Sequence, residues 1–499
     1  MAEFFAGKRV FISGATGFLG KAVVEKLLRS APDIDKIFVL IRPKKDVSVD
    51  DRLEKEILNS SVFERLYMER GPECLQFLQS KLHAVAGDVT LPMLGLNIQD
   101  LSLLQDGIDI TIHSAATVQF NDPLNFAVKM NCVGAMNMLE FAKSCKRLLC
   151  HLHVSTAYVG TGFREMYVPE ELAPLDFDPE QAINAALEAS GNQLDQLQDT
   201  LMGNYVNTYV LTKSMAEHMI VKIAGDDLPY AIYRPTIIGS AWKEPVPGWI
   251  DQIAGAGALI LASGTGIVTI MNGNEENITD VIPVDIAVNN LLMAIAAVVS
   301  RVQTPRPFIV HCGSSDPRQS PVQWQEINPV VVDYFQKHPS TKSPFPSKFK
   351  MIRSKTLFKM QWFFKYKVPS ALYSGFAKTI PNQKHKSQAV KLKKINRRAK
   401  ALLKAFEPFG KNQWVFLTDS MDILGRVVES TKASDTWTIE TGLIDWKSYT
   451  ESFCFGLKKY MLHEDVNKED LLNATQEESQ YTSKCATFSV QKNPLTVAA

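Results

Sequence analysis

"FISGATGFLGK", residues 11–21, places Gly14, Gly17 and Gly20 directly after an apolar run and at the start of a segment with helical spacing. The first glycine permits a tight turn from strand to helix, the second allows a pyrophosphate to approach the backbone, and the third lets the helix pack closely on the strand. The stretch therefore predicts a strand–turn–helix unit that binds a dinucleotide at a helix N-terminus.

Strand-like and helix-like patterns alternate along the N-terminal third of the chain. Short apolar, β-branched runs are separated by segments with apolar residues at helical spacing. Further strand-like runs cover residues 34–43, 82–88, 108–116 and 150–158, and helix-like segments cover residues 19–30 and 126–144. This alternation predicts an α/β fold, namely a Rossmann-like, doubly wound parallel sheet with helices on both faces.

The domain organisation is predicted from shifts in composition. A dinucleotide-binding domain is expected over residues 1–335, with an acidic, helical insertion at 165–207 and a smaller substrate lobe, rich in Gly and Pro, mainly at 236–335. A mainly helical C-terminal domain is expected over residues 350–465. The polar tail at 466–499 has the composition of a disordered segment.

The composition is that of an ordinary globular protein of 499 residues, with 45% apolar and 21% charged residues. The seven cysteines are scattered without a CxxC pair, which predicts a reducing compartment and neither disulfides nor a metal site. We find no secretory signal and no apolar run long enough to span a bilayer. We therefore predict an intracellular protein without a transmembrane helix, and the sequence leaves its oligomeric state open.

Positive charge is concentrated in one block of the sequence. Residues 334–406 contain nineteen Lys and Arg and no Asp or Glu, although the net charge of the chain is only +1. Such a block predicts a polyanionic partner, either nucleotide phosphates or an anionic membrane surface. Nucleic acid is a weaker alternative, because no nucleic-acid-binding motif accompanies the charge. Within this block, residues 355–376 interleave aromatic residues with lysines, as in an interfacial amphipathic segment. The alternative is a solvated basic face over a packed aromatic core.

Arg42 stands at the end of the second strand-like run, where an acidic residue would bind the ribose 2'-hydroxyl of NAD. Arg42, Lys44 and Lys45 offer positive charge to a 2'-phosphate instead, which favours NADPH over NADH; the alternative is a solvated strand end. Asp88 ends the next strand and is a candidate acceptor for the adenine amino group, although a turn-forming aspartate fits the pattern nearly as well.

Tyr209 and Lys213 form a YxxxK pair on a segment with helical spacing. Residues four apart share a helix face, so we expect the ammonium to lower the pKa of the phenol and make Tyr209 a usable proton donor. Lys213 is also expected to bind the nicotinamide ribose. Ser155 ends a strand at the ligand-binding edge of the sheet and is a candidate partner for the substrate oxygen, with Thr156 as its competitor.

These motifs resemble the extended short-chain dehydrogenase/reductase superfamily, to which Asn131 and the "HSAAT" strand end at His113 also point. Longer runs narrow the resemblance. "VLIRPK", "NTYVLTKSMAE", "YRPTIIGSAWKEPVPGWID" and "GLIDWKSYTESFCFGLKKYML" are similar to the eukaryotic alcohol-forming fatty acyl-CoA reductases. The similarity covers about residues 5–465 and includes a C-terminal domain of the male-sterility type.

The resemblance implies NADPH-dependent reduction of a long-chain acyl-CoA to a primary alcohol, in two hydride transfers through an aldehyde, with release of CoA. It makes Tyr209 the proton donor, Lys213 its pKa tuner and Ser155 or Thr156 the partner of the oxyanion. It extends the cofactor site, beyond the residues above, to Thr16, Phe18, Leu19, Val89 and Ala115. It also implies a cytosol-facing location at the endoplasmic reticulum or peroxisome membrane. Trp242 and Trp249 are candidates to shape the mouth of an acyl tunnel, with ordinary aromatic packing as the alternative.

Two features depart from the family pattern. Ser13 replaces the usual threonine before the first glycine, and the tail lacks the apolar anchor of several family members, so we expect peripheral membrane attachment through residues 355–376. Three other functions fit the motifs: a reductase that stops at the aldehyde, a nucleotide-sugar epimerase or dehydratase, and a redox-sensing scaffold without catalysis. The scaffold class usually lacks the Tyr or the Lys, and the epimerase class does not require the basic block.

Overall fold

The computed structural model describes residues 1–466 apart from positions 121, 164, 301, 303, 380–382 and 432–436. It divides into two units, each built from three segments of the chain. Unit 1 comprises residues 1–246, 281–319 and 414–442, and unit 2 comprises residues 247–280, 320–413 and the chain from 443 onward. The predicted polar tail lies almost wholly outside the described residues, and the predicted domain boundaries stay a prediction.

The centre of unit 1 is a seven-stranded sheet in the order β11-β7-β5-β4-β1-β2-β3, and all of its pairings are parallel. Its strands are β1 (Arg9–Ser13), β2 (Lys36–Ile41), β3 (Leu82–Ala86), β4 (Ile110–His113), β5 (Cys150–Val154), β7 (Tyr230–Pro235) and β11 (Ile309–Cys312). Successive strands β2 and β3 extend the sheet to one side of β1, and β4 onward extend it to the other. The strand order thus reverses next to β1, which is where ligands bind in doubly wound sheets.

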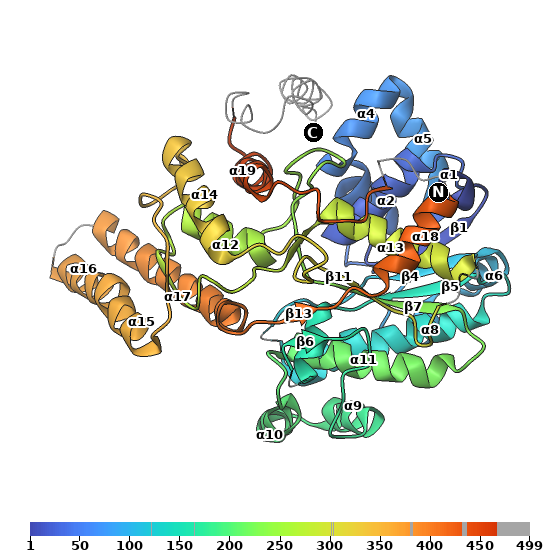
Figure 1. Ribbon diagram of the computed structural model, residues 1–499, viewed down its shortest axis with the longest axis horizontal. Helices are drawn as coiled ribbons and strands as arrows, with labels where there is room; N and C mark the ends of the chain where they lie inside the picture. The colour runs from blue at the N-terminus through green and yellow to red at the C-terminus, as the bar shows by residue number, and fades with distance from the viewer. Residues whose placement is uncertain are drawn as a thin grey trace. The chain divides into compact units, whose positions relative to one another are not determined.

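Helices cover both faces of this sheet, which confirms the predicted Rossmann-like fold. Figure 1 shows α8 (Gly134–Ser144) and α11 (Thr208–Ala224) on one side and α2 (Phe18–Ser30) and α13 (Val284–Val299) on the other. Residues on both faces of the central strands are buried, because the helices exclude water from each side. The other helices of unit 1 are α1 (Ala2–Phe5), α3 (Val49–Leu53), α4 (Glu64–Arg70), α5 (Cys74–Lys81), α6 (Ile98–Gly107), α7 (Leu124–Val128), α9 (Pro179–Glu188), α10 (Gly191–Met202) and α18 (Met421–Ser430).

Two short parallel pairs complete unit 1: β8 (Ile237–Gly239) with β10 (Val281–Pro283), and β6 (Tyr167–Val168) with β13 (Val415–Phe416). The second pair brings a late part of the chain back to an early one. The Phe416 amide donates to Ser315 Oγ at 3.0 Å, and the Ser420 amide donates to Glu170 Oε2 at 2.6 Å. Residues 414–442 therefore belong to the fold of unit 1 and do not merely follow it.

Unit 2 is mainly helical. Its elements are α12 (Gly255–Gly264), β9 (Ile270–Asn272), α14 (Trp324–Lys337), β12 (Lys350–Ile352), α15 (Lys355–Trp362), η7 (Phe363–Lys367), α16 (Val368–Thr379), α17 (Gln383–Lys411), α19 (Trp446–Gly456) and η9 (Leu457–Met461). Strands β9 and β12 pair in parallel. A Cβ added to Gly248 would lie 2.3 Å from the Ser452 carbonyl oxygen, so the loop after unit 1 packs directly on α19.

The hydrophobicity of the helices bears on membrane attachment. Within the part of the chain that the structure describes, no helix combines the length and the apolar character needed to cross a bilayer.

Candidate active site

The glycine turn connects β1 to α2 at the centre of the sheet. Gly14 has a φ of 80°, and an added Cβ there would lie 2.6 Å from the Ala115 amide nitrogen. A Cβ on Gly20 would lie 2.3 Å from the Gly14 carbonyl oxygen, so only glycine fits both positions. Gly17 is the N-cap of α2 and donates its N–H to Gly14 at 3.0 Å. Thr16 lies in the same turn, and Phe18 and Leu19 form the start of α2.

Polar side chains link β1, β4 and β5 next to this turn. Ser13 Oγ lies 2.7 Å from His113 Nδ1, so the departure from the family's threonine retains a hydroxyl that joins β1 to β4. The His113 ring stacks on His153 of β5, with centroids 5.3 Å apart. Burial lowers the pKa of both imidazoles, and the nearby Lys213 ammonium lowers it further. Both rings are therefore neutral at physiological pH.

Arg42 directly follows β2, whose residue Leu40 lies opposite Ser13 of β1. Its side chain is exposed, and its carbonyl accepts a hydrogen bond of 2.6 Å from Arg52 Nη1. Arg52 also forms two hydrogen bonds to Glu56, and Lys44 lies 3.4 Å from the same carboxylate. Arg52 thus fixes the backbone at the strand end that carries Arg42. No motif in the sequence pointed to Arg52.

Asp88 and Val89 follow β3. Asp88 Oδ1 accepts hydrogen bonds of 2.9 Å from both the amide and the hydroxyl of Thr90, the arrangement of a turn-forming aspartate. The Val89 carbonyl accepts a hydrogen bond of 2.9 Å from Asn137 Nδ2 on α8. One carboxylate oxygen of Asp88 is therefore engaged in a turn, as the alternative interpretation of this residue predicts. Its role toward adenine stays a prediction.

Ser155 and Thr156 follow β5, and their hydroxyls differ in what they contact. The Ser155 amide donates to the Tyr233 carbonyl at 2.7 Å, but its Oγ is buried and has no hydrogen-bond partner among the described residues. Thr156 Oγ1 accepts from the Tyr158 amide and donates to the Pro235 carbonyl, both at 3.4 Å. Because a buried hydroxyl normally has a partner, the Ser155 hydroxyl is the one that a ligand would satisfy.

Tyr209 and Lys213 lie on the first two turns of α11, which Asn207 caps by accepting from the Val210 amide at 2.9 Å. Lys213 is buried, with 2% of its surface exposed, and its Nζ donates to the Val154 carbonyl at 2.7 Å. Burial lowers the pKa of Lys213 to about 8. This bond holds the ammonium beside the end of β5, one residue before Ser155.

Burial dominates the pKa of Tyr209 in this structure, and the expected lowering by Lys213 stays a prediction. Burial raises the pKa of the Tyr209 phenol, because a phenolate would lose its solvation. The Lys213 ammonium is directed to the Val154 carbonyl, and the Tyr209 ring neighbours Phe120, with centroids 6.3 Å apart. The phenol is thus held in its protonated form, as a proton donor must be before it reacts.

Asn131 joins the helices around this site. It lies on the π-helical turn η5 (Lys129–Val133), accepts from the Thr117 amide at 2.9 Å and donates to Thr212 Oγ1 at 3.0 Å. Thr212 directly precedes Lys213, so this amide holds α11 against the loop that follows β4. The sequence singled out Asn131 only through the family resemblance.

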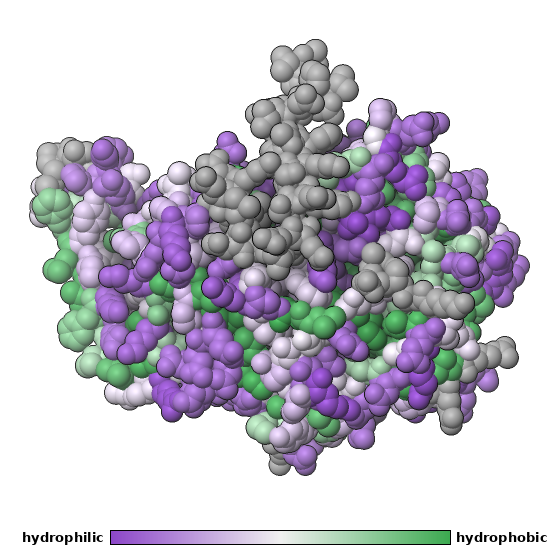
Figure 2. All heavy atoms as spheres, turned by 45° about the horizontal axis from the view of Figure 1, so that its top comes forward, coloured by the Kyte–Doolittle hydropathy of each residue, from purple (hydrophilic) through white to green (hydrophobic). Residues whose placement is uncertain are grey.

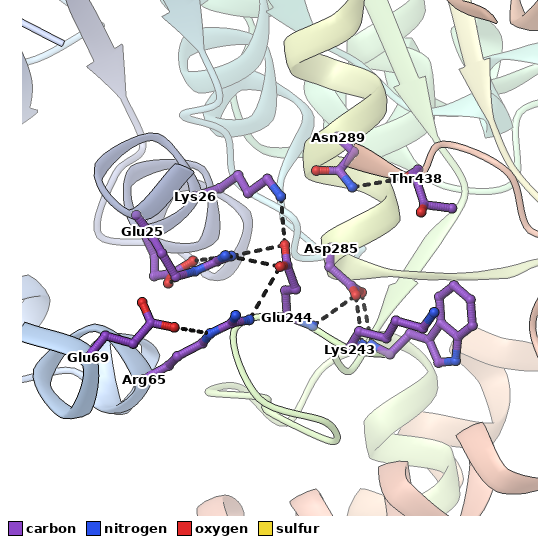
Figure 3. A network of polar contacts seen from close by, with 11 residues as sticks. Glu25, Lys26, Arg65, Glu69, Lys243, Glu244, Asp285, Asn289 and Thr438 are labelled. Atoms are coloured by element: carbon purple, nitrogen blue, oxygen red, sulfur yellow. Dashed lines mark hydrogen bonds and ion pairs between the residues drawn. The ribbon is translucent and has the colours of Figure 1, made fainter. Parts of the chain in front are cut away.

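An ion cluster fixes the segment after β8 (Figure 3). Glu244 Oε2 lies 2.6 Å from Lys26 Nζ and 3.0 Å from Arg29 Nη2, both on α2, and Arg65 approaches Oε1 at 3.3 Å. Burial raises the pKa of Glu244, but Lys26 and Arg29 outweigh it and bring the pKa to about 2. Glu244 therefore ties this segment to the same helix whose N-terminus carries the glycine turn.

Asp285 of α13 holds the same segment through its backbone. Its carboxylate accepts hydrogen bonds of 2.8–3.0 Å from the amides of Trp242, Lys243 and Glu244 (Figure 3). The sequence singled out this run as a family motif but did not indicate its anchoring role. Trp249, expected near an acyl tunnel, is completely buried in unit 2, as ordinary packing requires.

The residues of unit 1 fit a dinucleotide. The turn at Gly14 and Gly20 leaves room only for backbone, so a pyrophosphate can approach the start of α2. Arg42, Asp88, Ala115 and Ser155 follow neighbouring strands of the same parallel sheet and so meet at one edge. These four residues lie at the same edge as the glycine turn, and α11 adds Lys213 through its hydrogen bond to Val154.

Comparison with known proteins gives matches along most of the chain. An NAD-binding family profile described as male sterility protein matches residues 12–291, and a second profile with the same description matches residues 366–464. The protein is similar to fatty acyl-CoA reductase 1 of Mus musculus, with 32% identity over 93% of this chain and 87% of that one. The Homo sapiens protein of that name is also 32% identical, and fatty acyl-CoA reductase 2 of Homo sapiens is 28% identical, with the same coverage.

Solved structures show the same fold. The terminal R domain from the myxalamid PKS-NRPS biosynthetic pathway aligns with a TM-score of 0.55 and 17% identity over 91% of each chain. The reductase (R) domain of a non-ribosomal peptide synthetase from Mycobacterium tuberculosis aligns with a TM-score of 0.55 and 17% identity, over 91% of this chain and 92% of that one. At this identity the likeness shows the fold alone.

Proposed function

This chain belongs to the fatty acyl-CoA reductase family and is an oxidoreductase with a nicotinamide dinucleotide domain, and we propose that it reduces long-chain fatty acyl-CoA to a primary fatty alcohol with NADPH. The single observation that carries the catalytic assignment is the Ser155 hydroxyl, which is buried and has no partner among the described residues. It lies beside the carbonyl that Lys213 binds. A substrate carbonyl oxygen would satisfy this hydroxyl.

Each residue has a distinct role in the proposed reaction. The bound cofactor supplies hydride to the carbonyl carbon of the substrate. Ser155 Oγ donates a hydrogen bond to the carbonyl oxygen and stabilises the negative charge that develops there. Tyr209, kept protonated by burial, gives its proton to that oxygen. Lys213, held by Val154, positions its ammonium to lower the cost of the phenolate that this transfer leaves.

The product follows from applying these groups twice. After the first reduction the tetrahedral thioester adduct would expel CoA as a thiol and leave an aldehyde. The same hydroxyl and phenol then serve the aldehyde carbonyl, which would yield the primary alcohol after a second hydride and proton. Support for this product rests on the family membership, because nothing in the arrangement of Ser155 and Tyr209 distinguishes the two carbonyls.

The proposed choice of NADPH rests on Arg42. Its position after β2, next to β1, corresponds to the place where the adenosine ribose lies in sheets of this kind. Its exposed guanidinium is available to a 2'-phosphate, and Arg52 holds its backbone in place. A carboxylate, which would favour NADH by accepting from the 2'-hydroxyl, does not occupy this position.

The proposal is tested by incubating the purified protein with palmitoyl-CoA or stearoyl-CoA and either NADPH or NADH. Cofactor oxidation and free thiol are measured and the lipid products are identified, with Tyr209→Phe as the control. We expect two NADPH to be oxidised per CoA released, with fatty alcohol as the product. In the variant we expect neither NADPH oxidation nor fatty alcohol. Accumulation of aldehyde at one NADPH per CoA would change the assigned product, and no oxidation with any acyl-CoA would overturn the proposal.

A further inference from the structure

The part of the chain from Lys355 to Thr379 is one unbroken helix, formed by α15, the π-helical turn η7 and α16. Large apolar side chains are exposed along it. We call them the apolar stripe: Leu357, Met360, Phe363, Phe364, Leu372 and Phe376. Phe364 is 62% exposed and Leu372 is 70% exposed. Single exposed apolar residues are ordinary, but several gathered on one surface mark an interaction site. Figure 2 shows this apolar surface in green at the left of the view, where Figure 1 places α15 and α16.

The stripe follows one face of the helix. Five of its members stand at positions 357, 360, 364, 372 and 376, separated by three residues or by multiples of four. An α-helix has 3.6 residues per turn, so repeated steps of four would drift around it. The π-helical turn holds more residues per turn and compensates part of that drift. The stripe is therefore a continuous face and not a set of scattered exposed residues.

The opposite face of the same helix is anchored in unit 2. Trp362 is buried and stacks on Tyr366, with ring centroids 4.1 Å apart. Tyr366 Oη accepts from the Thr269 amide at 2.7 Å, and Asn396 of α17 donates to the Tyr366 carbonyl at 3.1 Å. These contacts fix the orientation of the helix, so the stripe is exposed because its other face is already packed.

Positive charge accompanies the stripe. Lys359, Lys365, Lys367 and Lys378 are exposed on the same helix. Helix α17, which packs against α16 and follows it in the chain, adds exposed basic side chains along most of its length: Lys384, Lys386, Lys391, Lys393, Lys394, Arg397, Arg398, Lys400 and Lys404. No Asp or Glu occurs between residues 334 and 406. Lysines next to an apolar face can hold their charged ends at a lipid headgroup while the apolar side chains insert.

We propose that the apolar stripe, together with the basic side chains of α17, docks this protein onto the surface of an anionic lipid bilayer. The combination favours lipid over other occupants. A second copy presenting the same face would bring two strongly positive surfaces together, which like-charge repulsion opposes. A nucleic acid would use the charge but leave the aromatic and aliphatic side chains of the stripe in water.

The test uses the full chain and sedimentation with vesicles of phosphatidylcholine alone or mixed with phosphatidylserine, at low and high salt. The stripe variant carries Phe364→Gln, Leu372→Gln and Phe376→Gln. The matched control carries Ile98→Gln and Leu103→Gln on α6, which removes exposed apolar side chains elsewhere. We expect binding to the mixed vesicles, weakened by salt, lost at least about tenfold in the stripe variant and retained in the control.

A charge variant, with Lys391→Gln, Lys393→Gln and Lys394→Gln, is expected to bind the mixed vesicles less and to show a weaker salt dependence. Equal binding by the stripe variant and the wild type would overturn the proposal. So would a stripe variant that loses self-association in ultracentrifugation while keeping vesicle binding, or a charge variant that loses RNA binding alone.

Acyl-CoA reduction in vesicle-free buffer separates this proposal from the proposed function. The stripe variant is expected to match the wild type in that assay, which shows that it is folded. A wild type that binds vesicles but reduces no acyl-CoA would overturn the proposed function and leave the membrane surface standing. A wild type that reduces acyl-CoA but binds none of the vesicles would overturn the membrane surface and leave the proposed function standing.

Discussion

Ser155 and Thr156 are adjacent, yet the fold engages only one of their hydroxyls. Thr156 Oγ1 caps the short helical turn that follows, whereas Ser155 Oγ is buried with no partner among the described residues. The sequence could not separate them, because both hydroxyls follow the same strand. The difference comes from the path of the next strand and turn, which supplies the Tyr158 amide and the Pro235 carbonyl to Thr156.

The first prediction compares these two residues. Ser155→Ala is expected to lower kcat by about 10²–10³-fold with little change in the free energy of unfolding, because it removes a donor to the developing oxyanion but no contact of the fold. Thr156→Ala is expected to cost about 1 kcal/mol of stability, as the loss of a cap does, with a smaller effect on kcat. Steady-state kinetics and thermal unfolding measure both; the opposite pattern would assign the oxyanion to Thr156.

A second prediction concerns the buried ammonium of Lys213. Because burial lowers its pKa to about 8, the amine is charged below that pH and neutral above it. If the ammonium stabilises the Tyr209 phenolate, kcat falls as the pH rises through about 8. Lys213→Arg keeps its charge over this range, so the basic limb of its pH profile is expected to move upward even where kcat is lower. A wild-type profile that is flat from pH 7 to 9 would contradict this role.

A third prediction concerns the guanidinium of Arg42. Arg42→Ala is expected to raise KM for NADPH by about 10–100-fold, the worth of a charged hydrogen bond, and to leave KM for NADH unchanged. Lys143→Ala on α8, which also removes an exposed cation, is the matched control. An equal rise in KM for NADPH and NADH would show that Arg42 acts on the turn itself and does not bind the 2'-phosphate.

At the scale of elements, α2 is held at both ends. Its N-terminus carries the glycine turn, and its later turns supply Lys26 and Arg29 to the carboxylate of Glu244. The turn was predictable because its three glycines stand three residues apart within one short stretch, and that spacing has one well-known geometry. The ion cluster was not, because Lys26 and Glu244 are 218 residues apart and nothing in either neighbourhood marks the other.

A fourth prediction follows from this cluster. Glu244→Gln removes the carboxylate that the buried Lys26 and Arg29 share, while Arg29 keeps its ion pair with Glu25. It is expected to lower the free energy of unfolding by about 3–5 kcal/mol in denaturant titrations near neutral pH. Glu69→Gln, which removes a more exposed partner of Arg65, is expected to cost less than about 1 kcal/mol.

The stability difference between the wild type and Glu244→Gln depends on pH because the pKa of Glu244 is lowered in the folded state. The folded carboxylate has a pKa of about 2 against an ordinary 4.5, so the folded state binds fewer protons between these values. Its contribution is complete above pH 4.5 and is lost as the pH falls toward 2. The gap between the wild type and Glu244→Gln is therefore expected to shrink over that range. A gap that stays constant would show that charge plays no part.

At the scale of the molecule, the chain enters and leaves each unit more than once. The sequence predicted the sheet and its flanking helices, since those depend on local periodicity. Residues 414–442, which lie inside the predicted C-terminal domain of residues 350–465, return to unit 1, and the predicted boundaries themselves stay a prediction. That return rests on β13 pairing with β6, strands of two residues each, and such short pairings leave no pattern in the sequence.

A fifth prediction tests this return. A chain that ends at residue 413 lacks β13 and α18, and with them the buried side chains of Phe416 and Leu424. We expect it to be insoluble, or to melt well below the full chain, even though every strand of the main sheet is present. Differential scanning fluorimetry of the two proteins measures this. An equally stable truncated chain would show that unit 1 folds without its last segment.

Glu170 and Ser420 are 250 residues apart and share a hydrogen bond in the finished fold. A ribosome adds roughly 5–20 residues each second, so about 12–50 s separate the synthesis of these two positions. Throughout that interval the nascent reductase domain exists without its closing segment, and part of the surface later covered by Phe416 is exposed to solvent. We therefore expect this protein to need holding chaperones during synthesis more than a contiguous sheet domain would, and to aggregate more in expression systems that are poor in them.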